Sequence, residues 1–328
     1  MRNMDVIAIG AAFCACVLIP ISPVLAVDAD IATALAWQIA LDRSGFSPGV
    51  IDGSAGAKTF RAVREFQQAR GLAVTGQFDS ATSVALGVDT ANVLTRYTVT
   101  PQDIAAVGPF PNDWNRKAQL KRLDCESLEA LLGERFHCTV ALLRSLNGGG
   151  SLANLRAGET ITVPSVSEAP ACRAARLEIN LDEKIVRAFD GAGRQVGMLH
   201  CSVAANQSDL PRGESRIVVI SHNPTYMFDP AKWPEVKNVR RKLLIPPGPR
   251  NPVGLCWIGL SIPSYGIHGT PQPEMIGKTG SHGCIRLTNW DAIRLSKMVE
   301  VGAPVKFVSA LQRSSTRTTP SAKRRQFD

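Results

Sequence analysis

The sequence has no long uninterrupted apolar run. Its most apolar stretch, residues 6–19, is shorter than the roughly 20 residues of a membrane-spanning helix, and prolines follow it closely. Arg2 gives this stretch a positive start, and the small residue Ala26 follows it, which is typical of a secretory signal. We therefore predict a signal peptide over residues 1–26 and no stable membrane span after its cleavage, with an uncleaved anchor as the alternative.

Acidic residues are nearly absent from the C-terminal tail, residues 310–328, where Asp328 is the only one. The tail is rich in Ser and Thr, lacks an apolar period and supplies much of the formal net charge of +9, so we expect it to be disordered. Its basic character suits a nucleic acid, but no nucleic-acid-binding motif accompanies it. We predict a solvated tail or a contact with an anionic cell envelope, and no nucleic-acid partner.

Paired cysteines are also missing. Six of the eight cysteines follow the predicted signal, and none of the six stands in a C-x-x-C pair. If Cys284 stays a free thiol, the other five allow at most two disulfides. The helix expected between Cys125 and Cys138 is about 15 Å long, which is too long for a bridge between its ends. Cys172 and Cys201, on nearby predicted strands, form the better candidate pair.

Residues 268–291 concentrate the reactive side chains, with one Cys, two His, one Ser and several Gly. Cys284 follows Gly283, and a glycine lets the backbone turn tightly and leaves the thiol open to a substrate. A thiol attacks as a thiolate, and the imidazole of His268 can take its proton. We predict Cys284 as nucleophile and His268 as general base. A buried apolar cysteine is one alternative; a zinc site is another, although a carboxylate at ligand spacing is lacking.

The motif His-Gly-Thr at residues 268–270, followed by Ser-His-Gly-Cys-Ile-Arg-Leu at residues 281–287, resembles the signature of the L,D-transpeptidase (YkuD-type) catalytic domain. Residues 245–254 and 265–267 also look like this family. The resemblance implies a mainly-β domain, a mixed β-sandwich, with the cysteine beside a central cleft. It also implies a thioester between the cysteine and a peptide stem of peptidoglycan, sensitivity to carbapenem-type inhibitors, and no need for a metal or an organic cofactor.

The same resemblance assigns roles to the residues around the thiol. The carbonyl of Gly269 would hold the second imidazole nitrogen, and the backbone N–H groups of Gly283 and Cys284 would form an oxyanion hole. Arg286 stands where some members carry Asn, and its guanidinium would pair with a substrate carboxylate or form a structural ion pair. The implied catalytic residues are Cys284, His268, Gly269, His282, Ser281 and Gly283; the implied substrate-binding residues are Arg286, Tyr265 and Thr270.

The composition, with 45% hydrophobic and 20% charged residues among 328, suits two or three folded domains. In the first, residues 27–90, apolar spacing predicts two helices and a short third that starts near Asp79. G-F-S-P-G-V-I-D-G at residues 45–53 and the run at residues 62–76 resemble a small all-α peptidoglycan-binding module of three helices. A helical bundle that serves only as a spacer is the alternative.

The second predicted domain, residues 97–164, reads as a strand, two helices and a second strand. This order resembles a LysM module, a small α+β glycan binder. An insertion between Pro101 and Cys125 departs from that pattern. A degenerate, purely structural module is therefore the alternative to a glycan-binding one.

The third predicted domain, residues 172–309, contains the reactive motif. Alternating or continuous apolar residues predict strands near residues 176–180, 184–189, 196–203, 217–220 and 305–308, and one helix near residues 290–299. The segment from 222 to 250 holds several prolines and a basic run, which is typical of a substrate lid or of a solvated basic loop. The tail, residues 310–328, follows this domain.

Together these features predict an exported peptidoglycan L,D-transpeptidase of the periplasm or cell wall, with stem peptides and glycan strands as partners. Two alternatives remain open at the level of the sequence. In the first, water resolves the thioester, which gives an L,D-carboxypeptidase or another hydrolase of wall peptides. In the second, the chain is a wall-binding protein without catalytic activity.

Overall fold

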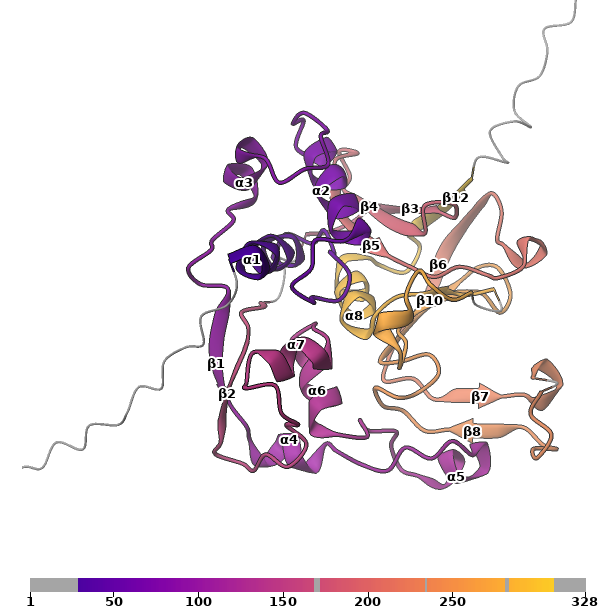
Figure 1. Cartoon of the computed structure of the whole chain (residues 1–328). Helices are drawn as coiled ribbons and strands as arrows, with labels where there is room; N and C mark the ends of the chain where they lie inside the picture. The colour runs from indigo at the N-terminus through magenta and orange to yellow at the C-terminus, as the bar shows by residue number, and fades with distance from the viewer. Residues whose placement is uncertain (1–28, 168–171, 234, 281–282, 310–328) are drawn as a thin grey trace, which may run out of the picture.

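The computed structural model describes residues 29–167, 172–233, 235–280 and 283–309, which form three packed regions (Figure 1). The predicted signal peptide, the predicted basic tail and two of the predicted site residues, Ser281 and His282, lie outside the described residues. Among the helices that are described, none is long and apolar enough to cross a membrane.

The N-terminal region is helical, as its apolar period predicts. It consists of α1 (Ala29–Arg43), α2 (Ala57–Ala69) and α3 (Ser80–Leu86). Asp79 begins α3 because its carboxylate accepts the Thr82 backbone N–H at 2.8 Å. The buried amide of Gln67 donates to Thr75 and Asp79 and accepts from the Gly76 backbone N–H. This hub fixes the turn between α2 and α3.

The middle region has the predicted order of a strand, two helices and a strand. Strand β1 (Leu94–Thr98) pairs antiparallel with β2 (Thr160–Pro164), and α6 (Leu128–Arg135) and α7 (Val140–Ser145) lie between them in the sequence. The insertion adds α4 (Pro101–Ala105) and α5 (Trp114–Gln119). The secondary structure is therefore as expected, while the LysM-like identity of this region stays a prediction.

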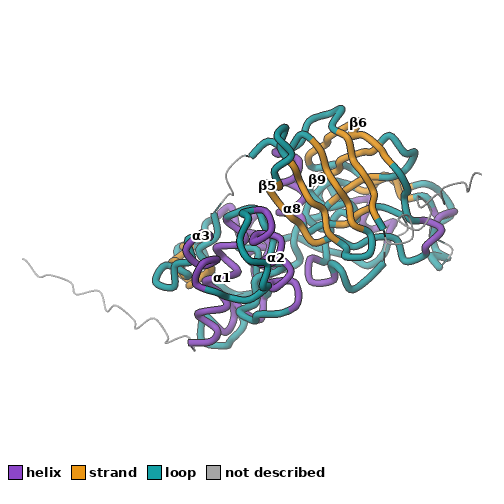
Figure 2. The backbone as a smooth tube through the Cα atoms, turned by 90° about the horizontal axis from the view of Figure 1, so that it is seen from above, coloured by secondary structure: helices purple, strands orange, loops and turns teal. Residues whose placement is uncertain are grey.

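The C-terminal region is a single curled sheet of eight strands, in the order β11-β10-β9-β6-β12-β3-β4-β5 (Figure 2). The pairs β12–β3 and β10–β11 are parallel and the others antiparallel, which makes the sheet mixed. The strands are β3 (Arg176–Asn180), β4 (Ile185–Phe189), β5 (Gln195–His200), β6 (Glu214–His222), β9 (Cys256–Leu260), β10 (Gly266–His268), β11 (Ile285–Arg286) and β12 (Pro304–Val308).

The long strand β6 turns this sheet into a sandwich. Its first residues pair with β12 and its later residues pair with β9, and its register with β9 is irregular between Ile217 and Val219. Such an irregularity bends a strand and increases its twist. The two halves of the sheet therefore enclose one core, which includes Ile179, Ile258 and Phe307. The mainly-β mixed sandwich expected for this domain is confirmed.

Helix α8 (Asn289–Met298) is the predicted helix of this domain and packs against β9 and β10. Thr288 caps it by accepting the Asp291 backbone N–H at 3.2 Å. A short hairpin, β7 (Tyr226–Phe228) and β8 (Leu243–Ile245), lies within the segment from 222 to 250. Three one-turn 3-10 helices complete the elements: η1 (Gln207–Asp209), η2 (Pro230–Lys232) and η3 (Pro273–Met275).

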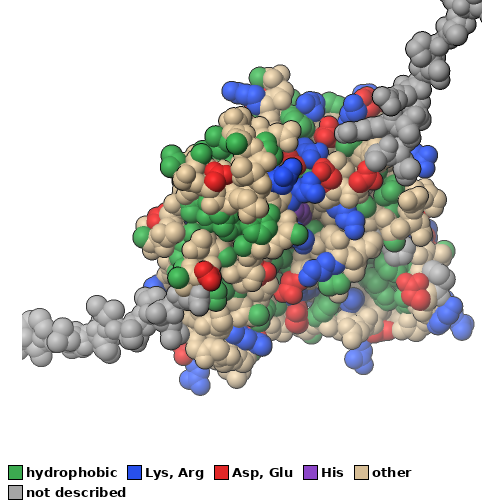
Figure 3. Space-filling view, turned by 45° about the horizontal axis from the view of Figure 1, so that its top comes forward, with side chains coloured by type: hydrophobic (Ala, Val, Ile, Leu, Met, Phe, Trp, Pro, Cys, Tyr) green, Lys and Arg blue, Asp and Glu red, His purple; other side chains and the backbone are tan. Residues whose placement is uncertain are grey.

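The N-terminal region covers the edge strand β5 of the sheet. Ser47 donates its backbone N–H to Met198 at 2.8 Å, and Met198 donates to Gly45 at 3.0 Å. Phe46 and Met198 share one apolar cluster, and both are fully buried. Charged side chains of both signs line the middle of the face in Figure 3, where this region meets the C-terminal region. The contact removes an exposed edge and fixes the two regions to each other.

The insertion in the middle region packs on the hairpin β7–β8. Trp114 of α5 stacks on Phe228 with 4.1 Å between ring centroids. Leu123 donates its backbone N–H to Pro247 at 2.8 Å and accepts that of Arg250 at 3.1 Å. These contacts explain why the insertion departs from the LysM-like pattern: its apolar residues belong to a cluster shared with the hairpin.

All six cysteines in the described part of the chain are free thiols. Cys172 is exposed, whereas Cys201 is completely buried in the core of the sheet. The pairing of Cys172 with Cys201 expected from the sequence is therefore wrong. Closeness of two predicted strands does not by itself bring their cysteines together. Cys201 faces the core, whereas Cys172 faces solvent.

Candidate active site

Cys284 and His268 lie at the ends of two neighbouring parallel strands. His268 ends β10 and pairs in register with Arg286 of β11. Cys284 stands directly before β11, two residues before Arg286. The positive charge of Arg286 acts on both the thiol and the imidazole, which agrees with both groups lying near this side chain. The sequence motif is thus local in space as well as in sequence.

Gly283 provides a backbone shape that other residues rarely adopt. Its φ of +142° lies in the region that favours glycine. A Cβ at this position would also approach the ring of Tyr265 at 3.3 Å. Tyr265 is itself held by its hydroxyl, which donates to the Asp209 carbonyl at 2.8 Å. The glycine therefore sets the turn that presents Cys284, and Tyr265 packs behind that turn.

The Cys284 side chain is half-buried, and its sulfur lies 3.5 Å from the Ser264 carbonyl oxygen. Burial raises the pKa of the thiol above its usual value. The Gly266 backbone N–H, Lys232 and Arg286 act in the opposite direction, since each favours the thiolate. The effect of burial on the pKa is the larger one. The thiol is therefore protonated at neutral pH and needs a base before it can attack.

His268 is buried, and its Nδ1 lies 2.6 Å from the Gly269 carbonyl oxygen. A carbonyl only accepts, so Nδ1 carries the proton and Nε2 keeps its lone pair. Burial and, to a smaller extent, the charge of Arg286 lower the pKa of His268 to about 4. The Gly269 hydrogen bond raises this pKa but is outweighed. The imidazole is therefore neutral at pH 7, which is the state that accepts a proton. The Trp257 ring stacks on it with 5.6 Å between centroids.

Asn289, the first residue of α8, holds the loop that orients His268. Its Oδ1 accepts the Leu255 backbone N–H at 3.0 Å, and its Nδ2 donates to Pro249 at 3.2 Å. A Cβ on Gly269 would meet Asn289 Oδ1 at 2.1 Å. Glycine is thus the only residue type that fits at position 269, next to Asn289.

The structure places the predicted substrate-binding residues around this site. Thr270 is buried, and its hydroxyl accepts the Gln272 backbone N–H at 3.3 Å, so it shapes the turn after His268. Arg286 donates to the carbonyls of Thr279 and Gly280. Its Nε atom is buried and has no hydrogen-bond partner within the described part of the chain. Arg286 thus braces the segment before the thiol and retains one unused donor.

The segment that holds the hairpin β7–β8 interacts with the thiol through charge. Burial raises the pKa of Tyr226; its hydrogen bond with Trp233 lowers it, and the charge of Cys284 raises it. Lys232 in η2 in turn lowers the pKa of Cys284. Sequence reasoning identified this segment as a candidate lid but did not single out Tyr226 or Lys232, because neither belongs to the motif. The charge interactions of both residues with Cys284 indicate that the segment lies near the thiol.

No group of three or more His, Cys, Asp or Glu side chains in the described ranges is arranged to hold a metal ion. The acid–base pair of the site is a thiol and a neutral imidazole. Such a pair can carry out nucleophilic acyl transfer with side chains alone.

Two domain families match the chain. Residues 174–307 match the L,D-transpeptidase catalytic domain, and residues 35–86 match a peptidoglycan binding domain. A Bacillus licheniformis protein named L,D-transpeptidase YkuD is 29% identical over 180 residues, which are 55% of this chain and 92% of that protein. A Bacillus subtilis protein named L,D-transpeptidase YqjB is 35% identical over 111 residues, which are 32% of this chain and 56% of that protein.

The crystal structure of an L,D-transpeptidase from Xylanimonas cellulosilytica aligns with a TM-score of 0.35 and 17% identity, over 84% of this chain and 92% of that one. The structure of the L,D-transpeptidase LdtMt1 in complex with imipenem aligns with a TM-score of 0.32 and 17% identity, over 46% and 63%. On these matches, the chain contains an L,D-transpeptidase catalytic domain of the YkuD type, with a peptidoglycan-binding domain ahead of it.

Proposed function

We propose that this L,D-transpeptidase is exported, acts in the periplasm or cell wall, and cross-links peptidoglycan through a thioester on Cys284. The observation that carries the proposal is the state of His268. Its Nδ1–H is held by the Gly269 carbonyl at 2.6 Å, and burial keeps the ring neutral. A neutral imidazole with a free Nε2, at the end of the strand next to the one that Cys284 precedes, is a general base ready for the protonated thiol.

The first half-reaction forms the thioester. The Cys284 sulfur attacks the carbonyl between the third residue of a tetrapeptide stem and its terminal D-residue, while the thiol proton passes to Nε2 of His268. The C–N bond then breaks, and His268 gives the proton to the departing amine of the D-residue. The backbone N–H groups of Gly283 and Cys284 stabilise the negative oxygen of the intermediate.

The second half-reaction forms the cross-link. An amine of a second stem attacks the thioester carbonyl, His268 accepts a proton from that amine, and the sulfur leaves and regains a proton. The new amide joins the two stems, and the enzyme returns to its starting state. Neither half-reaction needs a metal or an organic cofactor.

The remaining predicted site residues have supporting roles in this proposal. Arg286, through its unused Nε, binds a stem carboxylate near the thiol. Tyr265 and Thr270 shape the walls on either side of the catalytic pair. We assign His282 to the shape of the pocket and Ser281 to a nearby hydrogen bond.

The two N-terminal regions bind the wall in this proposal. We assign residues 27–90 to peptidoglycan binding, residues 97–164 to a LysM-like contact with glycan strands, and residues 172–309 to catalysis, after a signal peptide at residues 1–26 and before a basic tail at residues 310–328. The domain match over residues 35–86 supports the first assignment. The strand–helix–helix–strand order of the middle region supports the second.

The test uses purified muropeptides and a carbapenem. The wild-type protein and the Cys172→Ala control, which removes an exposed thiol away from the site, should form cross-linked products and one covalent carbapenem adduct. Cys284→Ala should form neither. Cross-linking by Cys284→Ala would refute the assignment of Cys284 as the nucleophile. Binding to insoluble wall without an adduct in the wild type would favour the non-catalytic reading.

A second candidate function shares the first half-reaction. If water resolves the thioester, the enzyme is an L,D-carboxypeptidase or another hydrolase of wall peptides. Mass spectrometry of the products with and without an acceptor stem separates the two activities. The half-burial of Cys284 limits the access of water to its thioester, which favours transfer to an amine.

A further inference from the structure

Lys58 joins the N-terminal region to the segment that leads to the thiol. It is the second residue of α2, and its Nζ donates to the Ile276 carbonyl oxygen at 2.6 Å. Ile276 directly follows η3 in the catalytic domain and is buried. A lysine normally extends its ammonium group into water. Here the side chain ends on the backbone of another region, and the hydrogen bond replaces water as the partner of the ammonium group.

Contacts along its length hold Lys58 in this position. Its own carbonyl accepts a hydrogen bond from Nε2 of His200 in β5, at 3.1 Å. Burial lowers the pKa of His200 to about 3, so this ring is neutral at pH 7. The aliphatic stem of Lys58 passes over Gly49, where a Cβ would lie 2.9 Å from its Cδ, and reaches Gly277, where a Cβ would lie 3.6 Å from its Cε. The side chain is therefore fixed in direction before it meets Ile276.

Residues 276–280, which Lys58 contacts, are fastened to β11. The Gly277 backbone N–H donates to Ser202 Oγ at 2.8 Å. Ser202 in turn exchanges two backbone hydrogen bonds with Arg286 of β11, at 2.8 and 2.9 Å. Lys58 and Ser202 thus hold neighbouring residues of one segment from two sides, and one of these sides belongs to the N-terminal region.

The same segment forms the base of the turn that presents the thiol. Gly280 lies four residues before Cys284, and Arg286 lies two residues after it. The Arg286 guanidinium donates to the carbonyls of Thr279 and Gly280, which joins the two ends of this turn. The charge of Arg286 also lowers the pKa of the Cys284 thiol. The position of the segment therefore affects both the place of the thiol and the ease with which it loses its proton.

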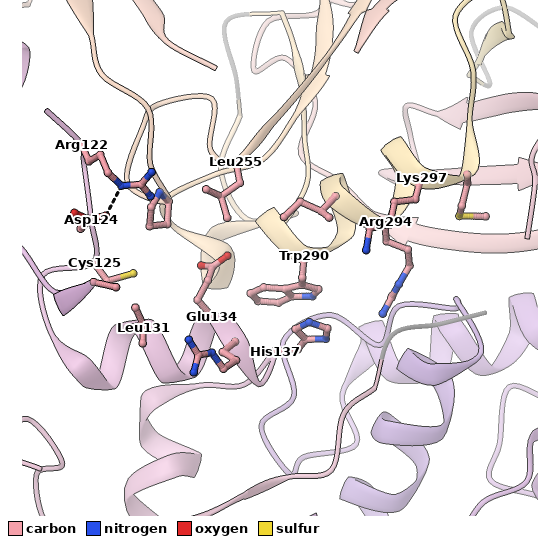
Figure 4. Close-up of a pocket in the computed structure, with 15 residues that line it drawn as sticks. Arg122, Asp124, Cys125, Leu131, Glu134, His137, Leu255, Trp290, Arg294 and Lys297 are labelled. Carbon is pink, nitrogen blue, oxygen red and sulfur yellow. Dashed lines mark hydrogen bonds and ion pairs between the residues drawn. The ribbon is translucent and has the colours of Figure 1, made fainter. Parts of the chain in front are cut away.

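The middle region contacts the catalytic domain at a different place. His137 stacks on Trp290 of α8 with 5.0 Å between ring centroids, and Glu134 lies between the middle region and that helix (Figure 4). These contacts fix α8, which begins five residues after Cys284. Lys58 instead acts on the segment before the thiol, so the N-terminal region has its own connection to the active site.

We propose that Lys58 is a positioning residue for the reaction at Cys284, which makes the N-terminal region part of the catalytic unit as well as a peptidoglycan-binding domain. Its hydrogen bond to Ile276 holds residues 276–280 in place. Loss of this bond lets the segment and the Arg286 guanidinium shift, and a shift of about 1 Å at a reacting group can slow a reaction about a hundredfold. The choice of Cys284 as the reacting group rests on the proposed function.

The test measures acylation by a carbapenem, with the rate at saturation and the half-saturating concentration determined separately. Lys58→Met keeps the apolar stem and removes the donor. Its saturating rate should fall about tenfold or more, while the half-saturating concentration should change less than about twofold, because the bond positions a group and does not bind the ligand. Lys58→Arg keeps a charged donor and should recover most of the rate. If Lys58→Met does not fold, Lys58→Gln, whose amide lies one bond closer to the backbone, replaces it with the same expectation.

Two variants are matched controls. Arg61→Met removes the ion pair of Arg61 with Glu183, one turn further along α2, and so weakens the same junction without touching residues 276–280. Lys278→Met removes an exposed positive charge from the segment itself. Both controls should be acylated at the wild-type rate. Hydrogen exchange of the Gly277 amide should become faster in Lys58→Met and stay unchanged in both controls.

Two results would overturn the proposal. One is a folded Lys58→Met with the acylation rate and the Gly277 exchange rate of the wild type. The other is equal slowing in Arg61→Met, which would mean that loosening the junction is enough to reduce the rate. If the wild type forms no carbapenem adduct, the proposed function fails, and exchange of the Gly277 amide still tests whether Lys58 holds the segment. The two failures are therefore distinguishable.

Discussion

Replacement of Glu134 by Gln should make the protein more stable above neutral pH. The structure holds the pKa of this carboxyl at about 7, against 4.5 for an ordinary glutamate, chiefly because burial disfavours its charge. Below pH 4.5 the group is protonated in both the folded and the unfolded chain and has no effect. As the pH rises from 4.5 to 7, the unfolded chain loses the proton first, so stability falls. Above pH 7 the loss is complete.

The magnitude follows from the difference between the two pKa values, which corresponds to about 3 kcal/mol when fully developed. Relaxation of the folded chain around the charge reduces this difference, so we treat it as an upper bound. Gln has nearly the same shape and still accepts the hydrogen bond from Asn289, but it carries no charge. The stability of Glu134→Gln relative to the wild type should therefore rise by up to about 3 kcal/mol between pH 4.5 and pH 8.

Urea unfolding of the ligand-free proteins at several pH values provides the measurement. Comparing the variant with the wild type at each pH cancels the titration of all other groups. Because three packed regions need not unfold together, hydrogen exchange of α6 is followed beside the global signal. Glu300→Gln, with an exposed side chain, should show no such trend. Parallel curves for wild type and Glu134→Gln would refute the reasoning, since they would mean that the carboxyl titrates normally.

The other predictions concern the interface and the reactive pair. Arg187→Ala leaves the buried carboxylate of Glu65 without its main partner and should lower the free energy of unfolding by about 3–5 kcal/mol; Arg194→Ala, at an exposed pair, should lower it by less than about 1 kcal/mol. Gly283→Ala forces a φ of +142° on a residue with a Cβ and should slow carbapenem acylation about a hundredfold while the protein stays folded; an unchanged rate contradicts the assigned turn. The acylation rate should be level from pH 5 to 8 and fall only near pH 4, where His268 gains its proton; an inflection at pH 6.5 would show an ordinary, exposed histidine.

Regular elements with their own pattern were predictable from the sequence. Strands β3 and β4 follow from alternating or continuous apolar residues, and α8 follows from its periodicity and a polar residue at its start. The candidate catalytic pair was predictable because both residues lie in one short motif, one ending β10 and the other directly preceding its parallel neighbour β11. The roles of those residues remain predictions until acylation is measured.

Elements that depend on distant partners were not predictable. The hairpin β7–β8 has only three residues in each strand, and it is stabilised by Trp114 from an insertion about a hundred residues earlier. The surroundings of Asn289 and the burial of Glu134 likewise depend on the packing of the middle region against α8. No periodicity in either segment reports such a contact, since packing between regions leaves no local pattern.

The way the three regions join has a consequence for how the enzyme meets its substrate. Asp42 in α1 is buried and binds both His137 of the middle region, at 3.1 Å, and Arg294 of the catalytic domain, at 3.0 Å. Burial raises the pKa of Asp42, but these two partners outweigh it and hold the pKa at about 2. A carboxylate that is charged and shared by three regions resists their separation, because each partner lost leaves a buried charge.

The insertion adds a second junction, at the hairpin beside Cys284. A wall-binding region tied by a flexible linker would only raise the local concentration of substrate. Here the peptidoglycan-binding domain packs directly on the sheet edge, and the middle region packs on the hairpin β7–β8. Once the first region is bound to a strand, the direction in which the thiol faces that strand is fixed. We therefore expect the orientation of the thiol, and not only its distance from a stem, to determine which of the neighbouring stems reacts.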